Sequence, residues 1–226
     1  MNIVELQNIS KFYFSNSIVT QAIKNVNLLI DNGEFIIITG ASGSGKTTLL
    51  YVASGLEKTT SGIVKLFDEP ILGMSERTTA ELRKSKIGFV FQFYNLLPNL
   101  TVYENVLLAA VIAGNKNEDK VKTALEIVSM WESKHKYPNE LSGGMQQRVA
   151  IARAIVNNPL IIFADEPTGN LDSVNAVQIL EIFKKLNKEF STTIVLVTHN
   201  SDFLSYASRS VILKDGVIVH DEKIRI

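Results

Sequence analysis

A glycine-rich stretch at residues 40–47, Gly-Ala-Ser-Gly-Ser-Gly-Lys-Thr, constrains the fold of this chain more than any other feature. It follows the apolar run 35–38 and precedes the helix-prone run 48–50. This order predicts a buried strand, a turn whose backbone N–H groups point inward, and a helix whose positive end faces the same point. We therefore expect a phosphate-binding loop, in which Lys46 reaches the β- and γ-phosphates and the Thr47 hydroxyl binds magnesium.

Three glycines of this loop, Gly40, Gly43 and Gly45, are expected to be indispensable, because a Cβ would prevent positive φ angles or the close approach of phosphate oxygens. A Gly/Ser-rich turn without a ligand is the alternative, and the strand before it and the helix after it favour the phosphate site. The residues expected to contact a nucleotide here are Gly40, Ala41, Ser42, Gly43, Ser44, Gly45, Lys46, Thr47 and Thr48.

Composition limits the classes of protein that need to be considered. The chain has 226 residues, 46% of them hydrophobic, which suits one compact α/β domain or a domain with an inserted lobe. Its 23 basic and 23 acidic residues give no net positive field, so we expect no nucleic-acid partner, while a local basic patch stays compatible with this balance. The absence of cysteine excludes disulfides and thiolate metal sites and fits a reducing compartment.

The sequence predicts no segment that enters a membrane. The N-terminus lacks the basic and apolar regions of a signal peptide, and the apolar run 106–114 is too short to span a bilayer. We therefore expect a cytoplasmic protein without direct membrane insertion, whose membrane association would come through a partner.

The N-terminal part of the chain has a β pattern, with apolar or aromatic runs on both sides of the polar turn 15–17. It predicts an antiparallel sheet in front of the nucleotide core. Asn32-Gly33 predicts a hairpin into the strand before the loop, and Asp215-Gly216 predicts a second hairpin. Further strands are expected at residues 63–67, 87–91, 160–164, 193–198, 211–213 and 217–219.

A mainly helical section interrupts the core strands. Thr101 and Glu104 form a capping-box pattern that starts a helix running to about Gly114, and a second helix is expected at about 118–130. Other helices are expected at about residues 75–83, 175–190 and 202–207. We predict an α/β fold in which residues 1–93 and 159–226 form a mixed core sheet with an N-terminal antiparallel β subdomain, and residues 94–158 form an inserted helical subdomain.

Two acidic residues, Asp165 and Glu166, follow the apolar run 160–164, which has the continuous hydrophobicity of a central parallel strand. Their carboxylates would lie at the carboxyl end of the strand, on the same sheet edge as the phosphate loop. Asp165 would hold magnesium, and Glu166 would polarise the attacking water as general base. An acidic turn without a chemical role is the alternative.

A second anion site is predicted at the helix that starts after Leu141. Ser142 is an N-cap candidate, and the amides of Gly143 and Gly144 lie beside its hydroxyl. A Ser-Gly-Gly helix start is more often a simple cap. If it binds an anion, the nucleotide of this same chain need not be the ligand.

Taken together, these segments resemble the motif set of the ATP-binding subunit of ABC transporters. They occur in the family's order and are residues 40–47, Gln92, residues 141–147, residues 160–166, residues 168–172 and His199. The resemblance covers essentially the whole chain. It implies a P-loop NTPase cassette that binds and hydrolyses ATP with magnesium as cofactor.

In that family two cassettes pack head to tail, and each ATP lies between the phosphate loop of one subunit and the signature helix of the other. The resemblance implies that Ser142, Gly143 and Gly144 contact the γ-phosphate bound to the partner subunit. It also implies that Gln92 senses the metal and water, as a metal ligand, and that Asp172 connects the two sites.

The resemblance assigns two further roles. His199 would hold the γ-phosphate and orient Glu166, so that Glu166, His199, Gln92 and Lys46 form the catalytic set. Tyr13 looks like the aromatic residue that stacks on adenine. Its neighbours Phe12 and Phe14 are alternatives for that role.

The segments 91–98 and 164–172, together with the compact length, look like cassettes of the macrolide-export and lipoprotein-release group, which also includes antimicrobial-peptide resistance systems. The resemblance implies a separate transmembrane permease, a second copy of the cassette or a homologous one, and a place on the cytoplasmic face of the cell membrane. The apolar residues of the segment 93–97 are expected to dock the permease, or else to belong to the core.

Two other functions stay open at this stage. One is the ATPase subunit of a membrane complex that transmits force or a signal, for example to a cell-wall hydrolase system, without moving a substrate. The other is a soluble ABC-type ATPase that acts on nucleic acid or in translation. The single cassette, which has no long insertion and no basic stripe, argues against this second alternative.

Overall fold

The computed structural model describes residues 2–15, 18–115 and 117–224, whose strands form two sheets. The antiparallel sheet has the order β2 (Ile18–Asp31), β1 (Asn2–Ser15), β4 (Ser61–Leu66) and β5 (Glu69–Pro70). The mixed sheet has the order β10 (Val217–Lys223), β9 (Arg209–Lys214), β3 (Phe35–Thr39), β8 (Thr193–Val197), β7 (Ile161–Asp165) and β6 (Ile87–Phe91). Both sheets that the sequence predicts are therefore present.

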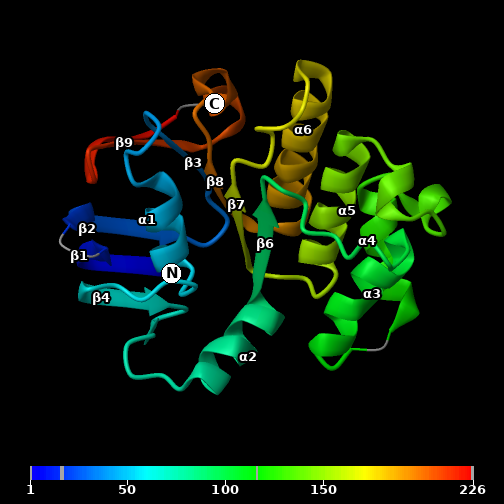
Figure 1. Ribbon diagram of the computed structural model, residues 1–226, viewed down its shortest axis with the longest axis horizontal. Helices are drawn as coiled ribbons and strands as arrows, with labels where there is room; N and C mark the ends of the chain where they lie inside the picture. The colour runs from blue at the N-terminus through cyan, green and yellow to red at the C-terminus, as the bar shows by residue number, and fades with distance from the viewer. Residues whose placement is uncertain (1, 16–17, 116, 225–226) are drawn as a thin grey trace.

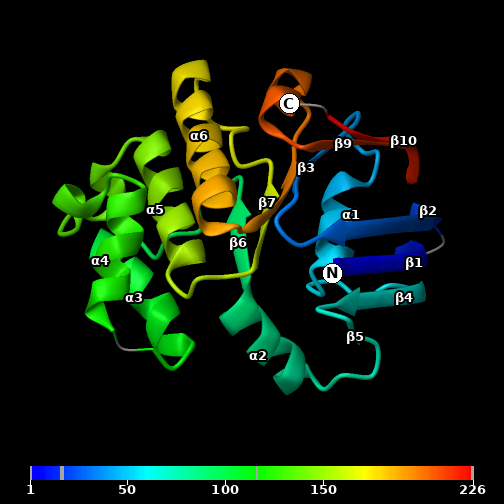
Figure 2. The same ribbon diagram turned by 180° about the vertical axis from the view of Figure 1, so that it is seen from behind.

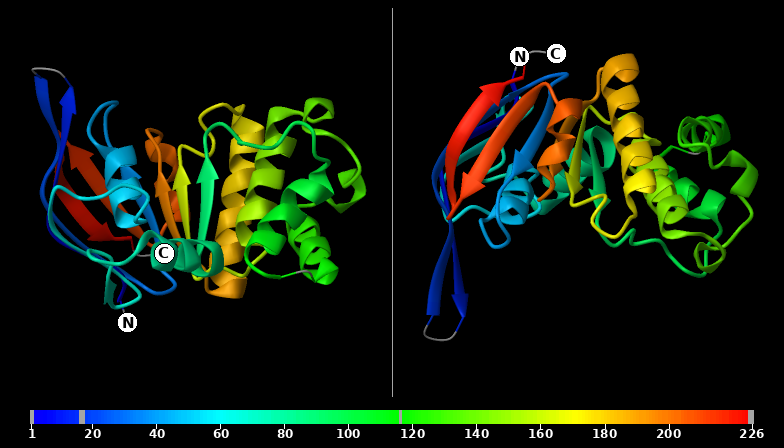
Figure 3. Two further views of the ribbon diagram at one scale, coloured as in Figure 1. Left: turned by 60° about the horizontal axis from the view of Figure 1, so that its bottom comes forward. Right: turned by 90° about the horizontal axis from the view of Figure 1, so that it is seen from above.

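The β1–β2 pair forms an arm that extends beyond the other strands (Figure 3). The two strands are antiparallel and stay paired as far as Ser15 and Ile18. The polar turn expected at 15–17 falls largely on residues 16–17, which lie outside the described residues. Near the body the arm is anchored by buried side chains such as Leu6, Ile9 and Ile23, while its outer residues are exposed.

The centre of the mixed sheet consists of strands that are buried on both faces. Every residue of β3, β7 and β8 is buried, as their continuous apolar sequences predict. These strands run parallel to one another, and β6 and β9 run parallel to their neighbours β7 and β3. Their carboxyl ends therefore meet at one edge of the sheet.

The helices cover the two faces of this sheet differently (Figures 1 and 2). On one face, α1 packs with the antiparallel sheet against residues such as Ile36 and Ile38, and on the other face α5 and α6 pack against residues such as Phe35 and Ile37. The α-helices are α1 (Lys46–Ala53), α2 (Glu76–Lys86), α3 (Val102–Ile112), α4 (Glu118–Ile127), α5 (Gly143–Ile155) and α6 (Ser173–Phe190). The 3-10 helices are η1 (Trp131–Ser133), η2 (Pro138–Glu140) and η3 (Ser201–Tyr206).

Several local expectations are confirmed. Thr101 and Glu104 form the predicted capping box at the start of α3, where Glu104 accepts a hydrogen bond from the Thr101 backbone N–H. The Asp215-Gly216 turn joins β9 to β10 as an antiparallel hairpin. None of the helices that the structure describes is both long and apolar enough to cross a membrane.

The hairpin predicted at Asn32-Gly33 is wrong. A turn does form there, with Gly33 at φ 79°, but β2 belongs to the antiparallel sheet while β3 pairs in parallel with β8 and β9. The second helix of the helical section also ends earlier than predicted, at Ile127, because Ser129 adopts a positive φ of 58°. The short helix expected near residue 202 is a 3-10 helix.

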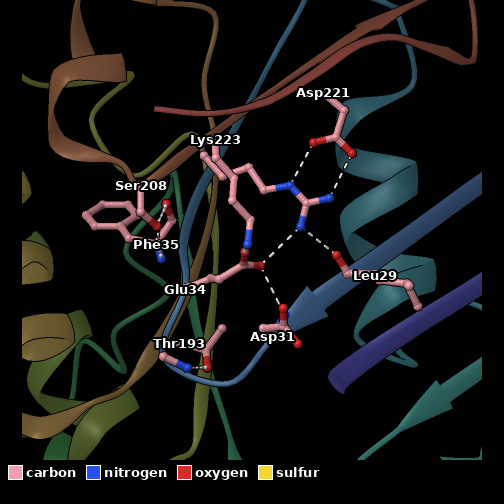
Figure 4. Close-up of polar contacts among 10 residues, drawn as sticks. Leu29, Asp31, Glu34, Phe35, Thr193, Ser208, Asp221 and Lys223 are labelled. Atoms are coloured by element: carbon pink, nitrogen blue, oxygen red, sulfur yellow. Dashed lines mark hydrogen bonds and ion pairs between the residues drawn. The ribbon is translucent and has the colours of Figure 1, made fainter. Parts of the chain in front are cut away.

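The two sheets are joined at the start of β3 by the guanidinium of Arg209 (Figure 4). Arg209 donates to both Asp221 carboxylate oxygens at 2.7 Å, to Glu34 Oε2 at 3.1 Å and to the Leu29 carbonyl of β2 at 2.7 Å. The side chains of Arg209 and Glu34 are only 13% and 12% exposed, so this charge cluster is largely removed from solvent. It fixes the antiparallel sheet to the end of β3 that is remote from the glycine-rich loop.

Replacing Arg209 by methionine should lower the free energy of unfolding by about 3 kcal/mol, because Glu34 loses the principal partner of its nearly buried carboxylate. Urea unfolding gives this value. Lys122→Met is the matched control, since the Lys122–Glu126 pair is half exposed at both ends, and its loss should stay below about 1 kcal/mol. Equal losses in the two variants would contradict the structural role given to Arg209.

Candidate nucleotide-binding site

The glycine-rich loop ends in a helix whose first amides lack a capping side chain. Gly45 is the N-cap of α1, at φ 102°, and makes no side-chain cap hydrogen bond. The other α-helices of the described residues all start with a capping side chain, namely Ser75, Thr101, Asn117, Ser142 and Asp172. The first amides of α1 therefore have no capping side chain to accept their hydrogen bonds, and an anion suits such a helix start.

The Lys46 side chain lies over the loop. Its Nζ atom donates to the carbonyls of Gly40 and Ala41 at 2.9 and 3.0 Å, and the residue is nearly buried. The buried Ser44 hydroxyl has no hydrogen-bond partner within the described residues. An ammonium group and an unsatisfied hydroxyl in one loop of amides are a donor set that fits the phosphates of a nucleotide.

Two of the three loop glycines are required for a reason that the sequence did not reveal. A Cβ on Gly40 would lie 2.1 Å from the Leu213 carbonyl oxygen, and one on Gly45 would lie 2.5 Å from that of Ala22. The loop is therefore clamped between β9 and β2. Gly43, at φ 77°, has open space around it, so only its backbone conformation favours glycine.

Thr47 and Asp165, predicted to bind magnesium, lie together although 118 residues separate them. The Thr47 hydroxyl donates to Asp165 Oδ1 at 2.9 Å. A hydroxyl and a carboxylate are the few oxygen ligands that magnesium takes from a protein when phosphates and waters supply the others. The described residues contain no cluster of three or more His, Cys, Asp or Glu side chains that could hold a metal by themselves. The pair thus fits a magnesium ion that arrives with a nucleotide.

Tyr51 is a residue of this site that the sequence analysis missed. Burial, and then the charge and a hydrogen bond of Asp165, raise the pKa of Tyr51 to about 12, so its hydroxyl stays protonated. Its ring packs edge-on against Phe91, which is paired with Asp165 across β6 and β7. The sequence could have indicated Tyr51, because this residue follows Thr47 by four positions and therefore lies on the same face of α1.

Glu166 and His199 are also brought together. His199 Nδ1 lies 3.0 Å from Glu166 Oε2. The Glu166 side chain is only 16% exposed, and its backbone adopts φ 46°, an unusual conformation for a non-glycine residue and more so before a proline. Such strain costs on the order of 1–3 kcal/mol, and it often marks a residue whose side chain must point in a fixed direction.

Gln92 does not join the Thr47–Asp165 pair in this structure. Its Nε2 donates to Asn170 Oδ1 at 3.2 Å, and Asn170 Nδ2 donates back to the Gln92 carbonyl at 3.2 Å. Asn170 is a second residue that the sequence analysis left without a role, although it lies inside the segment 168–172 that carries the resemblance. Only the fold brings it to Gln92, which lies 78 residues earlier.

The segment 141–147, which the resemblance identifies as the family's signature motif, leads into α5 as predicted. The Ser142 hydroxyl accepts from the Met145 amide at 3.4 Å, so it is an N-cap. A Cβ on Gly143 would lie 2.7 Å from the Tyr94 hydroxyl, and one on Gly144 would lie 2.4 Å from Asn175 Oδ1. The two glycines therefore leave room for polar groups at the helix start.

The phosphate loop and the signature segment serve helices on opposite faces of the mixed sheet, α1 on one side and α5 on the other (Figures 1 and 2). The start of α1 has no capping side chain, whereas the Ser142 hydroxyl caps the start of α5.

Two predicted site residues, Tyr13 and Asp172, lie farther out. Tyr13 is 40% exposed and pairs with Thr20 on the arm, close along β2 to Ala22, which contacts Gly45. Asp172 caps α6 by accepting from the Asn175 backbone and side chain at 2.8 and 2.7 Å, and these hydrogen bonds lower the pKa of Asp172.

The segment 93–97 is divided between surface and core. Phe93 is 71% exposed and Leu97 is exposed too, whereas Leu96 packs against the helical core and Tyr94 is partly covered. The Arg153 guanidinium fixes the segment by donating to the carbonyls of Tyr94 and Asn95. Two exposed apolar side chains, Phe93 and Leu97, therefore follow Gln92 in the chain.

Comparison with known proteins adds a family context to this geometry. A sequence profile described as "ABC transporter" matches residues 23–169. The lipoprotein-releasing system ATP-binding protein LolD 1 of Chlorobium chlorochromatii is 43% identical, with 99% of this chain and 93% of that protein covered. The macrolide export ATP-binding/permease protein MacB of Chlorobium phaeobacteroides is 44% identical, and the match covers 98% of this chain but 34% of that protein.

A solved structure is similar along almost the whole chain. It is the dimeric post-hydrolysis state of the ATP-binding cassette MJ0796, of Methanocaldococcus jannaschii, bound to ADP and Pi. The TM-score is 0.91 at 41% identity, and 99% of each chain is covered. The expected α/β cassette fold is thereby confirmed.

Alanine at Gly45 should destabilise the nucleotide-free protein by about 2 kcal/mol more than alanine at Gly43. Both variants place a Cβ at a positive φ, but only the one at Gly45 meets a backbone oxygen, that of Ala22. Thermal unfolding of the two variants measures the difference. Equal stabilities of the two variants would contradict the close contact between Gly45 and the Ala22 carbonyl oxygen.

Proposed function

The chain belongs to the ABC transporter family, and from this premise we propose that it is the ATP-hydrolysing subunit of a membrane system for export or lipoprotein release. The observation that carries the proposal is that the Thr47–Asp165 and Glu166–His199 pairs form at the strand edge that holds the glycine-rich loop. We infer that a second cassette helps to enclose the ATP. The dimeric state reported for the similar cassette supports this arrangement.

The partners follow from the names of the relatives. LolD is the ATP-binding protein of a lipoprotein-releasing system, and MacB joins an ATP-binding part to a permease in one chain. We infer that this chain works with a separate permease, at the cytoplasmic face of the membrane and peripherally attached. Macrolide, antimicrobial-peptide or lipoprotein handling is the proposed range of activity, and the exposed Phe93 and Leu97 are proposed to dock the permease.

The phosphate loop would bind the triphosphate of ATP. The α1 amides and Lys46 would hold the β- and γ-phosphates, and Lys46 would exchange its bonds to the Gly40 and Ala41 carbonyls for bonds to phosphate oxygens. Tyr13 would stack on the adenine. Thr47, Asp165 and Gln92 would hold magnesium, which neutralises charge on the phosphates.

Glu166 would act as the general base. Its carboxylate would accept a proton from the water that attacks the γ-phosphorus, and the bond from that phosphorus to the β,γ-bridging oxygen would break to release ADP and phosphate. The hydrogen bond between His199 and Glu166 supports a role for His199 in orienting this base and holding the γ-phosphate. The strained backbone at Glu166 supports a fixed direction for its carboxylate.

The second cassette would complete the site. Ser142, Gly143 and Gly144 would bring the amides and hydroxyl at the start of α5 to the γ-phosphate bound by the other subunit, and Asp172 would link the two sites. These donors reach the ligand only in the closed dimer, so ATP would stabilise closure and hydrolysis would reverse it. The proposed division into residues 1–93 and 159–226 as core and 94–158 as helical subdomain would let the two parts move in this cycle.

Replacement of Glu166 by glutamine should reduce the turnover number for ATP at least 100-fold, because the amide cannot accept the proton. The variant should still bind ATP and accumulate as a dimer, which sedimentation would detect. Glu181→Gln, on the surface of α6, is the control and should keep wild-type turnover. Retained turnover in the Glu166 variant would refute its assignment as the base.

The trapped Glu166→Gln protein also tests the membrane partner. Affinity purification from detergent-solubilised membranes with ATP and magnesium should recover a membrane protein with few spans and a large external domain. A partner with many spans and little external mass would indicate a different transporter class. Recovery of no membrane protein would contradict the proposed function.

A further inference from the structure

Lys11 is a nearly buried lysine beside the residue that is proposed to stack on adenine. Its side chain is 11% exposed, and its ammonium donates to the Glu57 carboxylate and, at 2.8 Å, to the Lys58 carbonyl. An ammonium has three N–H donors, so these two acceptors leave the third for another partner. Because removing a charge from water is costly, each partner helps to keep the ammonium in this place.

The third partner is the ring of Tyr13. The Lys11 Nζ atom lies over this ring, 5.0 Å from its centroid, which is the separation of a cation–π contact. Lys11 and Tyr13 are two residues apart on β1, and such residues project from the same side of a strand. Tyr13 is still 40% exposed, so surface remains on which a base can stack.

The acceptors of Lys11 belong to the segment that follows α1. The Glu57 amide donates to the Tyr51 carbonyl of α1 at 3.0 Å, and this hydrogen bond fixes the segment to the end of the helix. Lys11 therefore connects the Tyr13 ring, on the arm, to the helix that begins at the glycine-rich loop.

One helix thus supports both ends of the proposed nucleotide site. In the proposed function the start of α1 binds the phosphates, while the segment after its end holds Lys11 and, through it, Tyr13. An exposed tyrosine without such a contact can take several rotamers, and binding a base would then have to order its ring. The ammonium lowers this cost by holding the ring before the nucleotide arrives.

We propose that Lys11 is a positioning residue for nucleotide binding, which holds the Tyr13 ring so that adenine stacks on the surface left open. The inference rests on the proposed function, in which Tyr13 stacks on adenine. Lys11 acts only through Tyr13, and the phosphate contacts do not depend on its ammonium.

Lys11→Met keeps most of the aliphatic side chain and removes the ammonium. Calorimetric titration with ADP in the presence of magnesium should give an affinity about fivefold weaker than that of the wild type, because Tyr13 loses its cation–π contact. Binding of pyrophosphate, which has no base, should be unchanged. A purely structural role for Lys11 would weaken the binding of both ligands alike.

A double-variant cycle tests whether Lys11 acts through Tyr13. In a Tyr13→Ala background, Lys11→Met should cause no further loss of ADP affinity. Glu57→Gln keeps the ammonium but removes the carboxylate that anchors it, and should weaken ADP binding by less than Lys11→Met does. Lys65→Met is the matched control, because it breaks another ion pair of the antiparallel sheet, with Glu5 at 3.0 Å, and it should leave both affinities unchanged.

An unchanged ADP affinity in Lys11→Met, or an equal weakening of ADP and pyrophosphate binding, would overturn the proposal. A loss that persists in the Tyr13→Ala background would also overturn it, since Lys11 would then act on the nucleotide without the ring. Failure of the proposed function is recognised separately, because the wild-type protein would then bind neither ADP nor pyrophosphate.

Discussion

The parallel pairing of β6, β7, β8 and β3 is the constraint on which the rest of the structure depends. It places the residues after four strands at one edge, so that the phosphate loop, Asp165, Glu166 and the segments carrying Gln92 and His199 meet there although they are distant in sequence. The strands can be this apolar because helices and the antiparallel sheet cover both faces. Burial of the sheet thus gives the polar edge its fixed geometry.

The same layering separates the start of α1 from the start of α5. The two helices pack on opposite faces of the mixed sheet, and in the proposed function a second chain brings the start of its own α5 to the nucleotide bound at α1. The structural similarity to a dimeric cassette with bound ADP and Pi agrees with this reasoning. In the proposed function, the decisive contacts are those that form only when two cassettes close.

Much of the fold and of the candidate site was predictable from the sequence, and the exceptions share a physical cause. The loop at 40–47, the capping box at Thr101 and the Asp165–Glu166 strand end are local patterns, and each is found where its pattern places it. The Asn32-Gly33 turn was assigned to the wrong pairing because a turn type does not determine which sheet receives the next strand. Asn170 and the clamp on Gly45 were missed because they depend on contacts between segments remote in sequence.

Because the chain contains no cysteine, an introduced pair of thiols can test directly whether the ATP site is shared between chains. Ala41→Cys and Ser142→Cys, combined with Glu166→Gln, place one thiol at each half of the proposed site, and a short bifunctional thiol reagent can join them. Our account predicts covalent dimers that form with ATP and magnesium and are absent without nucleotide. Cross-linking within single chains, or dimers whose yield does not depend on ATP, would contradict it.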